Sequence, residues 1–251
     1  MRLNRFLAQA GLSSRRGADV IIASGRVAVN GETVTRLGTD VDPARDAVTL
    51  DGRPVALPPS FTYVLVNKPA GIVVTMSDPQ GRPTVASLVS DVGARVVPVG
   101  RLDADTEGLL LMTDDGWLAH RVAHPSFELD KVYRVEAAGV LSESERKRLE
   151  TGVDLDGRLT APASVVVLST AGNATVAEIT LHEGRKRQVR RMFEVVGHRV
   201  IRLVRTRLGP LTLGGLEPGS RRPLTPDELD SLRAAVGEGK EEGPREGAAS
   251  A

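Results

Sequence analysis

Residues 97–116, VPVGRLDADTEGLLLMTDDG, place four charged side chains between two apolar runs. The apolar runs predict one strand on each side of a short polar loop. The loop holds Arg101, Asp103, Asp105 and Glu107. Charged residues on a loop that a rigid sheet supports form a suitable platform for a site. Composition alone also allows a simple polar surface turn.

Three chemistries fit the carboxylates of this loop. Asp103 and Asp105 can bind magnesium for phosphoryl transfer, but alternate residues of an extended loop point in opposite directions. Two carboxylates can hydrolyse a glycoside, which requires a defined separation that a sequence does not show. A single carboxylate can act on the glycosidic bond of a nucleoside. The residues by themselves leave these alternatives open.

The rest of the chain predicts strands and helices in a mixed order. This order lacks a regular strand–helix alternation, which favours an α+β fold over a doubly wound sheet. The stretch RKRQVRRMFEVVG predicts a basic amphipathic helix over 185–197. Further helices are expected at 115–124 and 142–150, and strands at 61–71, 94–100, 108–113, 131–139, 164–169, 174–184 and 198–209.

Residues 1–58 are expected to form a small separate module. Two short helices are predicted, the second capped by Ser13 or Ser14, and Asn30-Gly31 marks a hairpin. The module also carries a group of cations: Arg2, Arg5, Arg15, Arg16 and Arg26.

The segment ALPPS at 56–60 predicts a linker to a second domain at 61–236. The last residues, 237–251, are rich in Gly, Glu and Ala and are expected to form a disordered acidic tail.

Composition restricts the class of protein. The 251 residues are 41% hydrophobic but only 3% aromatic, so the core must consist of Val, Leu, Ile and Ala. The absence of cysteine excludes disulfides, thiolate metal sites and cysteine nucleophiles. Without a long apolar run or a signal peptide, a cytoplasmic location is expected.

The net charge of +1 conceals an uneven distribution of charge. Residues 181–222 contain 11 Lys or Arg against three Glu, whereas 227–251 contain seven acidic and three basic residues. Charges about 10 Å apart are screened at physiological salt, so the local excess matters more than the sum. The basic stretch indicates a polyanionic partner, although a solvated helix face is an equal alternative.

Several motifs occur together in one order. The segments NKPAG (67–71), GRLDADTEGLLLMTDDG (100–116), KVYRVE (131–136) and EGRKRQVRRMFEVVGHRVIRLVRTRLGPL (183–211) resemble the pseudouridine synthases that modify ribosomal RNA. Residues 1–58 resemble the small RNA-binding domain first seen in ribosomal protein S-four. The resemblance extends over residues 1–230. It implies a mixed, mainly antiparallel sheet with flanking helices, preceded by a small α/β RNA-binding domain.

The resemblance also implies roles for individual residues. Asp103 matches the essential aspartate, which acts either on the anomeric carbon or on a ribose proton. Tyr133 matches the aromatic residue that stacks on the base, and Arg190 the basic residue that pairs with the aspartate. Arg101 matches a residue proposed to help extrude the nucleotide, and Leu203 an apolar residue beside the uracil.

Other basic residues are expected to contact RNA. Lys68, Arg185 and Arg187 are predicted to bind the substrate, and the arginines of residues 1–58 to bind RNA elsewhere. His120 and His124 have the spacing of a metal pair, but Pro125 ends their segment, and neither a metal nor a cofactor is expected.

The expected partner is ribosomal RNA, with 23S favoured over 16S, and the chain is expected to be a monomer. A non-catalytic RNA-binding or ribosome-assembly protein is the alternative.

Overall fold

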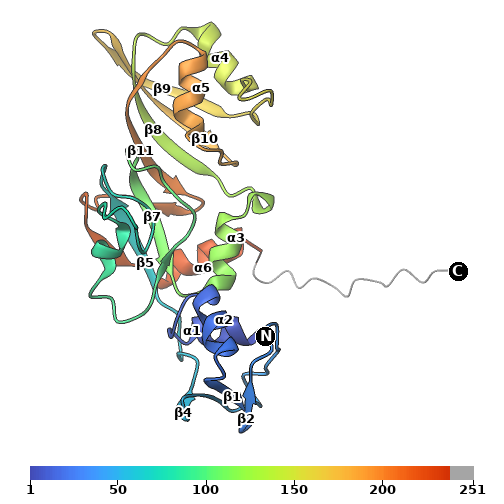
Figure 1. Ribbon diagram of the computed structural model, residues 1–251. Coiled ribbons are helices and arrows are strands. Elements are labelled where there is room, and N and C mark those ends of the chain that lie inside the picture. The colour runs from blue at the N-terminus through green and yellow to red at the C-terminus, as the bar shows by residue number, and fades with distance from the viewer. Residues whose placement is uncertain (238–251) are drawn as a thin grey trace, which may run out of the picture. The chain divides into compact units, whose positions relative to one another are not determined.

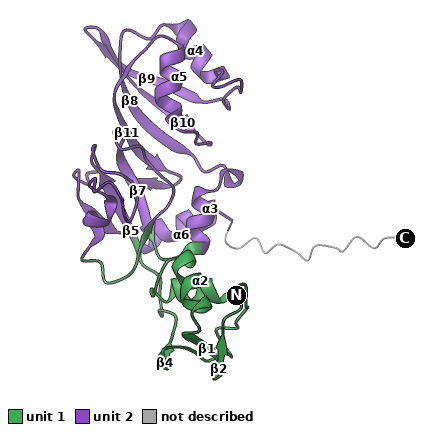
Figure 2. Cartoon of the chain, in the orientation of Figure 1, with its two compact units in different colours: residues 1–63, 91–97, 113–116 green, residues 64–90, 98–112, 117–251 purple. Residues whose placement is uncertain are grey.

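The computed structural model describes residues 1–237, and the expected tail at 237–251 lies, apart from Gly237, outside the described residues. The chain divides into two compact units (Figure 2). One contains residues 1–63, 91–97 and 113–116, and the other contains 64–90, 98–112 and the remainder. The proposed domain boundaries at 58 and 61 stay a prediction. Among residues 1–237, none of the helices combines the length and apolar character needed to cross a membrane.

The N-terminal module contains two helices and one small sheet. Helix α1 covers Leu3–Gln9, and α2 covers Arg15–Ala23 with Ser14 as its N-cap, accepting a hydrogen bond from Gly17 N at 3.0 Å. The antiparallel strands follow the order β2-β1-β3-β4. They are β1 (Val27–Val29), β2 (Glu32–Val34), β3 (Val48–Leu50) and β4 (Arg53–Val55).

The predicted hairpin at Asn30-Gly31 is confirmed. Asn30 has φ 52° and Gly31 has φ 85°, and the strands on each side pair Val27 with Val34. Positive φ at both central residues matches the twist of an antiparallel ribbon, which explains the preference for Asn-Gly.

The large sheet contains nine strands and carries the site. Seven follow the order β13-β5-β7-β11-β8-β10-β9, with β12 beside β11 and β6 beside β7. The β7–β11 pair is parallel. The antiparallel pairs are β13–β5, β11–β8, β8–β10, β10–β9 and β11–β12. The strands are β5 (Tyr63–Lys68), β6 (Val97–Pro98), β7 (Glu107–Thr113), β8 (Lys131–Ala138), β9 (Ser164–Ala171), β10 (Ala174–Leu181), β11 (Val200–Leu208), β12 (Leu211–Thr212) and β13 (Arg221–Pro223).

Helices α4 and α5 lie beside β8–β11 (Figure 1). Val189, Met192 and Phe193 of α5 are buried in one cluster with Val135 of β8 and Ile179 of β10. The apolar face predicted for this helix is therefore confirmed, and so is the mixed α+β fold. The helical segments are η1 (Val85–Val89), α3 (Gly116–Ala123), η2 (Pro125–Phe127), α4 (Glu143–Thr151), α5 (Gln188–Val195) and α6 (Pro226–Ala235).

Several predicted elements are shorter than expected, and two of the differences bear on the site. The strand predicted at 94–100 contains only Val97–Pro98, and the helix predicted from 185 begins at Gln188. Arg187 adopts the left-handed conformation, with φ 52° and ψ 32°, so the helix cannot continue toward the N-terminus. The basic residues 185–187 therefore belong to a loop.

The contact between β7 and β11 requires a glycine at position 108. Gly108 has φ +105° and pairs with Arg205 where β7 meets β11. A Cβ atom at this position would lie 2.3 Å from the carbonyl oxygen of Arg205. Only glycine therefore allows the two strands to approach directly behind the charged loop.

Candidate active site

A cleft of about 510 Å³ opens beside the charged loop that precedes β7. Six of the residues predicted to form the site line it: Arg101, Asp103, Tyr133, Arg185, Arg187 and Leu203. They come from distant parts of the chain, and the strand order β7-β11-β8 brings their elements together.

Asp103 projects from a loop that is fixed through its backbone. Thr106 N donates to Asp103 O at 3.0 Å, and the next carbonyl, Ala104 O, accepts from Gly71 N at 2.7 Å and from Lys68 Nζ at 3.1 Å. The Asp103 side chain is half-buried, and its carboxylate has no hydrogen bond or ion pair with any residue in 1–237. It is therefore free to meet a substrate in the cleft.

Tyr133 and Leu203 form an apolar wall of the same cleft. Tyr133 lies on β8, is half-buried and packs against the core below α5. Leu203 lies on the neighbouring strand β11, opposite Val135, and is 4% exposed. Their rigid positions on paired strands suit the recognition of a planar base.

Asp105, and not Asp103, pairs with the arginines of the 185–190 segment. Its two carboxylate oxygens accept from Arg187 Nη1 and Nη2, each at 3.0 Å, and Arg190 Nε lies 3.3 Å from Oδ2. Arg190 Nη2 also donates to the backbone carbonyl of Asp105 at 2.8 Å. The expected pairing of Arg190 with Asp103 is therefore wrong in this structure, because Arg190 reaches the loop two residues later.

These contacts control the charges around Asp103. Although partial burial raises the pKa of Asp105, the hydrogen bonds of Arg187 and the charges of Arg190 and Arg187 hold it below its usual value. The hydrogen bonds that Arg187 donates to Asp105 raise the pKa of Arg187, and the negative charges of Asp105 and Asp103 add to this effect. Arg187 is thus a cation whose charge acts on both Asp103 and the cleft.

Lys68 does not have the predicted role in binding the substrate. The residue is 0% exposed, and its ammonium donates to Pro69 O at 2.8 Å, Ile72 O at 2.9 Å and Ala104 O at 3.1 Å. The prediction is therefore wrong. The structural reason is that packing of the turn after β5 against the charged loop encloses the side chain completely. Burial lowers the pKa of Lys68 to about 8, although nearby carboxylates oppose this shift.

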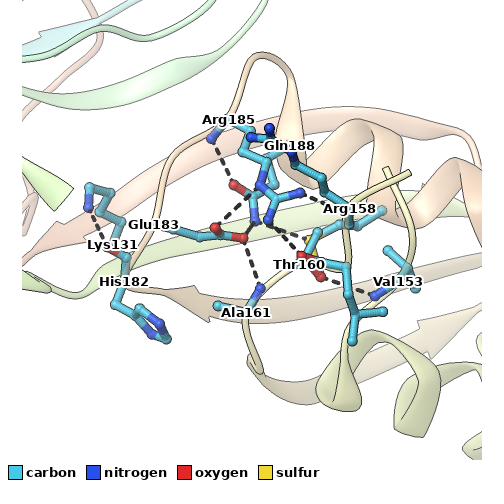
Figure 3. A network of polar contacts seen from close by, with 11 residues as sticks. Lys131, Val153, Arg158, Thr160, Ala161, His182, Glu183, Arg185 and Gln188 are labelled. Carbon is cyan, nitrogen blue, oxygen red and sulfur yellow. Dashed lines mark hydrogen bonds and ion pairs between the residues drawn. The ribbon is translucent and has the colours of Figure 1, made fainter. Parts of the chain in front are cut away.

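Arg185 is held by a polar network at the edge of the cleft (Figure 3). Its Nη1 and Nη2 donate to Arg158 O at 2.9 Å and Leu159 O at 2.7 Å. Glu183 accepts from Gln188 Nε2 at 2.5 Å, and Arg185 N donates to Gln188 Oε1 at 2.8 Å. The guanidinium of Arg185 is therefore occupied by the protein, and the network fixes the loop that carries Arg187.

Three cations that line the cleft were not named as site residues from the sequence: Lys131, Lys186 and Arg205. Lys131 Nζ donates to Leu129 O at 3.0 Å and His182 O at 3.2 Å, and Arg205, 3% exposed, donates from Nε to Leu109 O at 2.8 Å. Burial is the main cause that lowers the pKa of Lys131, and the positive charge of Arg205 lowers it further. Alternation along β8 and β11 indicated which face these residues share, but not that this face forms a cleft.

The five arginines of the N-terminal module that were predicted to bind RNA fall into two groups. Arg2 pairs with Asp40 at 2.8 Å, and Arg26 Nε donates to Asp51 at 2.9 Å. The other three are exposed and have no ion pair within residues 1–237: Arg5, Arg15 and Arg16. These three remain available to a polyanion.

Comparison with known proteins agrees with this geometry. Residues 62–195 match the model of a family described as RNA pseudouridylate synthase, and residues 1–48 match the S4 domain. The chain is 41% identical over 241 residues to "Ribosomal large subunit pseudouridine synthase B" of Bacillus subtilis, covering 95% of this chain and 98% of that protein. It is 44% identical over 238 residues to an "Uncharacterized RNA pseudouridine synthase" of Aquifex aeolicus, covering 94% and 95% respectively.

A solved structure is similar over almost its full length. The crystal structure of a pseudouridylate synthase superimposes with a TM-score of 0.67 at 32% identity, covering 92% of this chain and 99% of that chain. Together with the charged loop, the sheet and the N-terminal module, these similarities show that the chain belongs to the RNA pseudouridylate synthase family and carries an N-terminal S4 domain.

Proposed function

We infer that this enzyme isomerises one uridine of 23S ribosomal RNA to pseudouridine with Asp103 as its catalytic carboxylate. The observation that carries the proposal is the unpaired Asp103 carboxylate in a cleft that Tyr133 and Leu203 also line. The large-subunit substrate is supported by the name of the Bacillus subtilis relative, which shares the full length of the chain.

The reaction rearranges bonds without a change in composition. The bond between ribose C1′ and uracil N1 breaks, the base turns, and a bond forms between C1′ and C5. The proton on C5 is then removed, and N1 gains a proton. Because no oxidation or hydrolysis takes place, a carboxylate and a proton acceptor are sufficient for the chemistry. Asp103 acts on the sugar, either at C1′ or at a neighbouring proton.

The other side chains of the cleft support this step. Tyr133 stacks on the uracil and is placed to help remove the proton from C5, while Leu203 packs beside the base. A flipped base leaves its stack at a cost of a few kcal/mol, and stacking on an aromatic ring returns about 1–3 kcal/mol. Arg187 and Arg190 hold the loop and keep the surroundings of Asp103 positive.

The decisive experiment compares Asp103→Asn with the wild type on 23S and 16S transcripts labelled with [5-³H]uridine. Formation of pseudouridine releases the tritium of C5. We expect release from 23S RNA by the wild type, a loss of at least about 10³-fold for Asp103→Asn, and little change for the control Asp156→Asn. Asp156 is an exposed carboxylate, 79% accessible, on the loop after α4.

The alternatives give different results. If tritium is released from 16S RNA and not from 23S RNA, the substrate is 16S RNA and the proposed chemistry still holds. Tight RNA binding without tritium release by the wild type indicates a non-catalytic RNA-binding protein and refutes the proposal. We also propose that the enzyme acts as a monomer, and light scattering that gives twice the mass of the chain contradicts this.

A further inference from the structure

We propose that His120, His124 and Phe127 form a second base-binding surface, on which a single-stranded nucleotide of the RNA substrate stacks outside the catalytic cleft. The proposal rests on the proposed function, because it requires an RNA whose target nucleotide enters the cleft.

The first argument for this surface is the solvent exposure of its two histidine rings. Among residues 1–237, His120 and His124 are the only aromatic or imidazole side chains that are exposed; the other rings are buried or half-buried. With 3% aromatic residues, the chain has few rings to offer to RNA bases. Two exposed rings, His120 in α3 and His124 directly after its end, therefore form the most concentrated accessible stacking surface of the described chain.

The rings are also held in place. The centroids of His120 and His124 lie 5.0 Å apart with planes 30° from parallel, and Phe127 presents its edge to His124 at 6.3 Å. Behind them, the guanidinium of Arg121 lies 4.5 Å from the Trp117 ring and 5.0 Å from the Phe127 ring. A surface ordered in this way loses little conformational entropy when a base stacks on it.

The geometry argues against a metal pair, the alternative that the i, i+4 spacing suggests. Ring nitrogens bind a metal through lone pairs in the ring plane, which must converge on one point. The rings of His120 and His124 lie face to face instead, and His124 Nδ1 already accepts from Ser126 N at 3.3 Å. Within residues 1–237, no group of three or more His, Asp or Glu side chains could hold a metal ion.

Continuity with the cleft identifies the occupant. Val122 and Ala123, between the two histidines in sequence, line the catalytic cleft. Ala123 is exposed and lies one helical turn from His120, so both share one face of α3. A nucleotide drawn into the cleft leaves its neighbour in the strand unstacked at this edge. The exposed imidazole face meets that neighbour, and since every base has a π-face, stacking there tolerates any sequence.

The test uses the full-length enzyme and the 23S transcript labelled with [5-³H]uridine. The double variant His120→Ala/His124→Ala is compared with His120→Phe/His124→Phe, which keeps two rings but removes their nitrogens. We expect KM to rise about 5- to 20-fold in the alanine variant, with kcat within about twofold. In the phenylalanine variant, we expect KM to return to within about twofold of the wild type. Melting temperatures show whether both variants fold.

The results distinguish a failure of the proposed stacking surface from a failure of the proposed function. If the wild type releases tritium and the alanine variant has an unchanged KM, the stacking surface is refuted while the proposed function stands. If the phenylalanine variant is as defective as the alanine variant, the nitrogens and not the ring faces are required, and stacking is also refuted. If the wild type releases no tritium, the proposed function fails first.

Discussion

Replacement of Lys68 by methionine is a direct test of how the loop that carries Asp103 is supported. The substitution keeps a long unbranched side chain but removes the ammonium that donates to Pro69 O, Ile72 O and Ala104 O. All three carbonyls lose the lysine donor, but Ala104 O keeps its hydrogen bond from Gly71 N at 2.7 Å, so only Pro69 O and Ile72 O are left without a donor among residues 1–237. A buried polar group without a partner costs about 1–3 kcal/mol, which gives a loss of roughly 2–6 kcal/mol.

The buried charge offsets part of this loss. Lys68 has a pKa of about 8 in the folded protein against 10.5 ordinarily, so burial of its charged form costs about 3 kcal/mol, a cost that methionine avoids. Near pH 7, the stability of Lys68→Met should therefore lie between about 1 kcal/mol above and about 3 kcal/mol below that of the wild type.

The dependence on pH gives the sharper result. Below pH 8 the folded and unfolded states both hold the lysine proton, so the difference between Lys68→Met and the wild type is constant. Between pH 8 and 10.5 only the unfolded state keeps the proton. The wild type therefore gains stability relative to the variant as pH rises, by about 1.4 kcal/mol per pH unit.

Urea denaturation at several pH values between 7 and 10 measures this difference. Lys147→Met is a matched control, because its ammonium is 67% exposed on α4 and contacts Glu143 only at 3.7 Å; its stability should change by less than about 0.5 kcal/mol at every pH. A difference between Lys68→Met and the wild type that stays flat across this range would refute the assigned burial and proton affinity of Lys68.

Three further predictions concern other parts of the enzyme. Asp105→Asn should lower kcat/KM in the tritium assay by about tenfold or more, because Arg187 and Arg190, which Asp105 holds, become misplaced. The site is half-exposed, so the stability loss should be only about 1 kcal/mol. An unchanged kcat/KM contradicts the role of Asp105 in positioning the two arginines. Gly108→Ala should destabilise the protein by more than about 3 kcal/mol in thermal melts, since its Cβ would lie 2.3 Å from Arg205 O, and a melting temperature near that of the wild type disproves this. Arg15→Ala/Arg16→Ala should reduce the slope of log K against log salt for RNA binding by roughly 1.5, whereas an equal slope shows that these residues do not touch phosphate.

Much of the local structure was predictable because it depends on neighbouring residues. The Asn30-Gly31 hairpin and the helix at 142–150 were both expected and both form. The helix begins at a capping box between Ser142 and Glu145, which like the hairpin depends on short-range backbone chemistry. The loop with Asp103 also lies between two strands as expected. Apolar periodicity identifies which face of a strand or helix is buried, and such signals act over a few residues.

The partners of the charged side chains were less predictable. Arg190 was expected to pair with Asp103 and pairs with Asp105, and Lys68 was expected to bind RNA and is enclosed. A long, flexible Lys or Arg side chain can reach many different acceptors. The acceptor that it contacts in the fold lies far away in the sequence, 36 positions from Lys68 in one case and 85 positions from Arg190 in the other.

The sequence alone therefore determined the class of fold, the N-terminal module and the loop that carries Asp103. These features depend on apolar periodicity, turn chemistry and short motifs, all of which are formed by residues close together in the sequence. Only the tertiary structure decided that Asp103 has a free carboxylate in a cleft with Tyr133, that Asp105 holds the arginines, and that the rings of His120 and His124 stack on each other. The physical reason is that burial, charge pairing and the shape of a cleft arise where distant strands meet, and the order β7-β11-β8 exists only in the folded sheet.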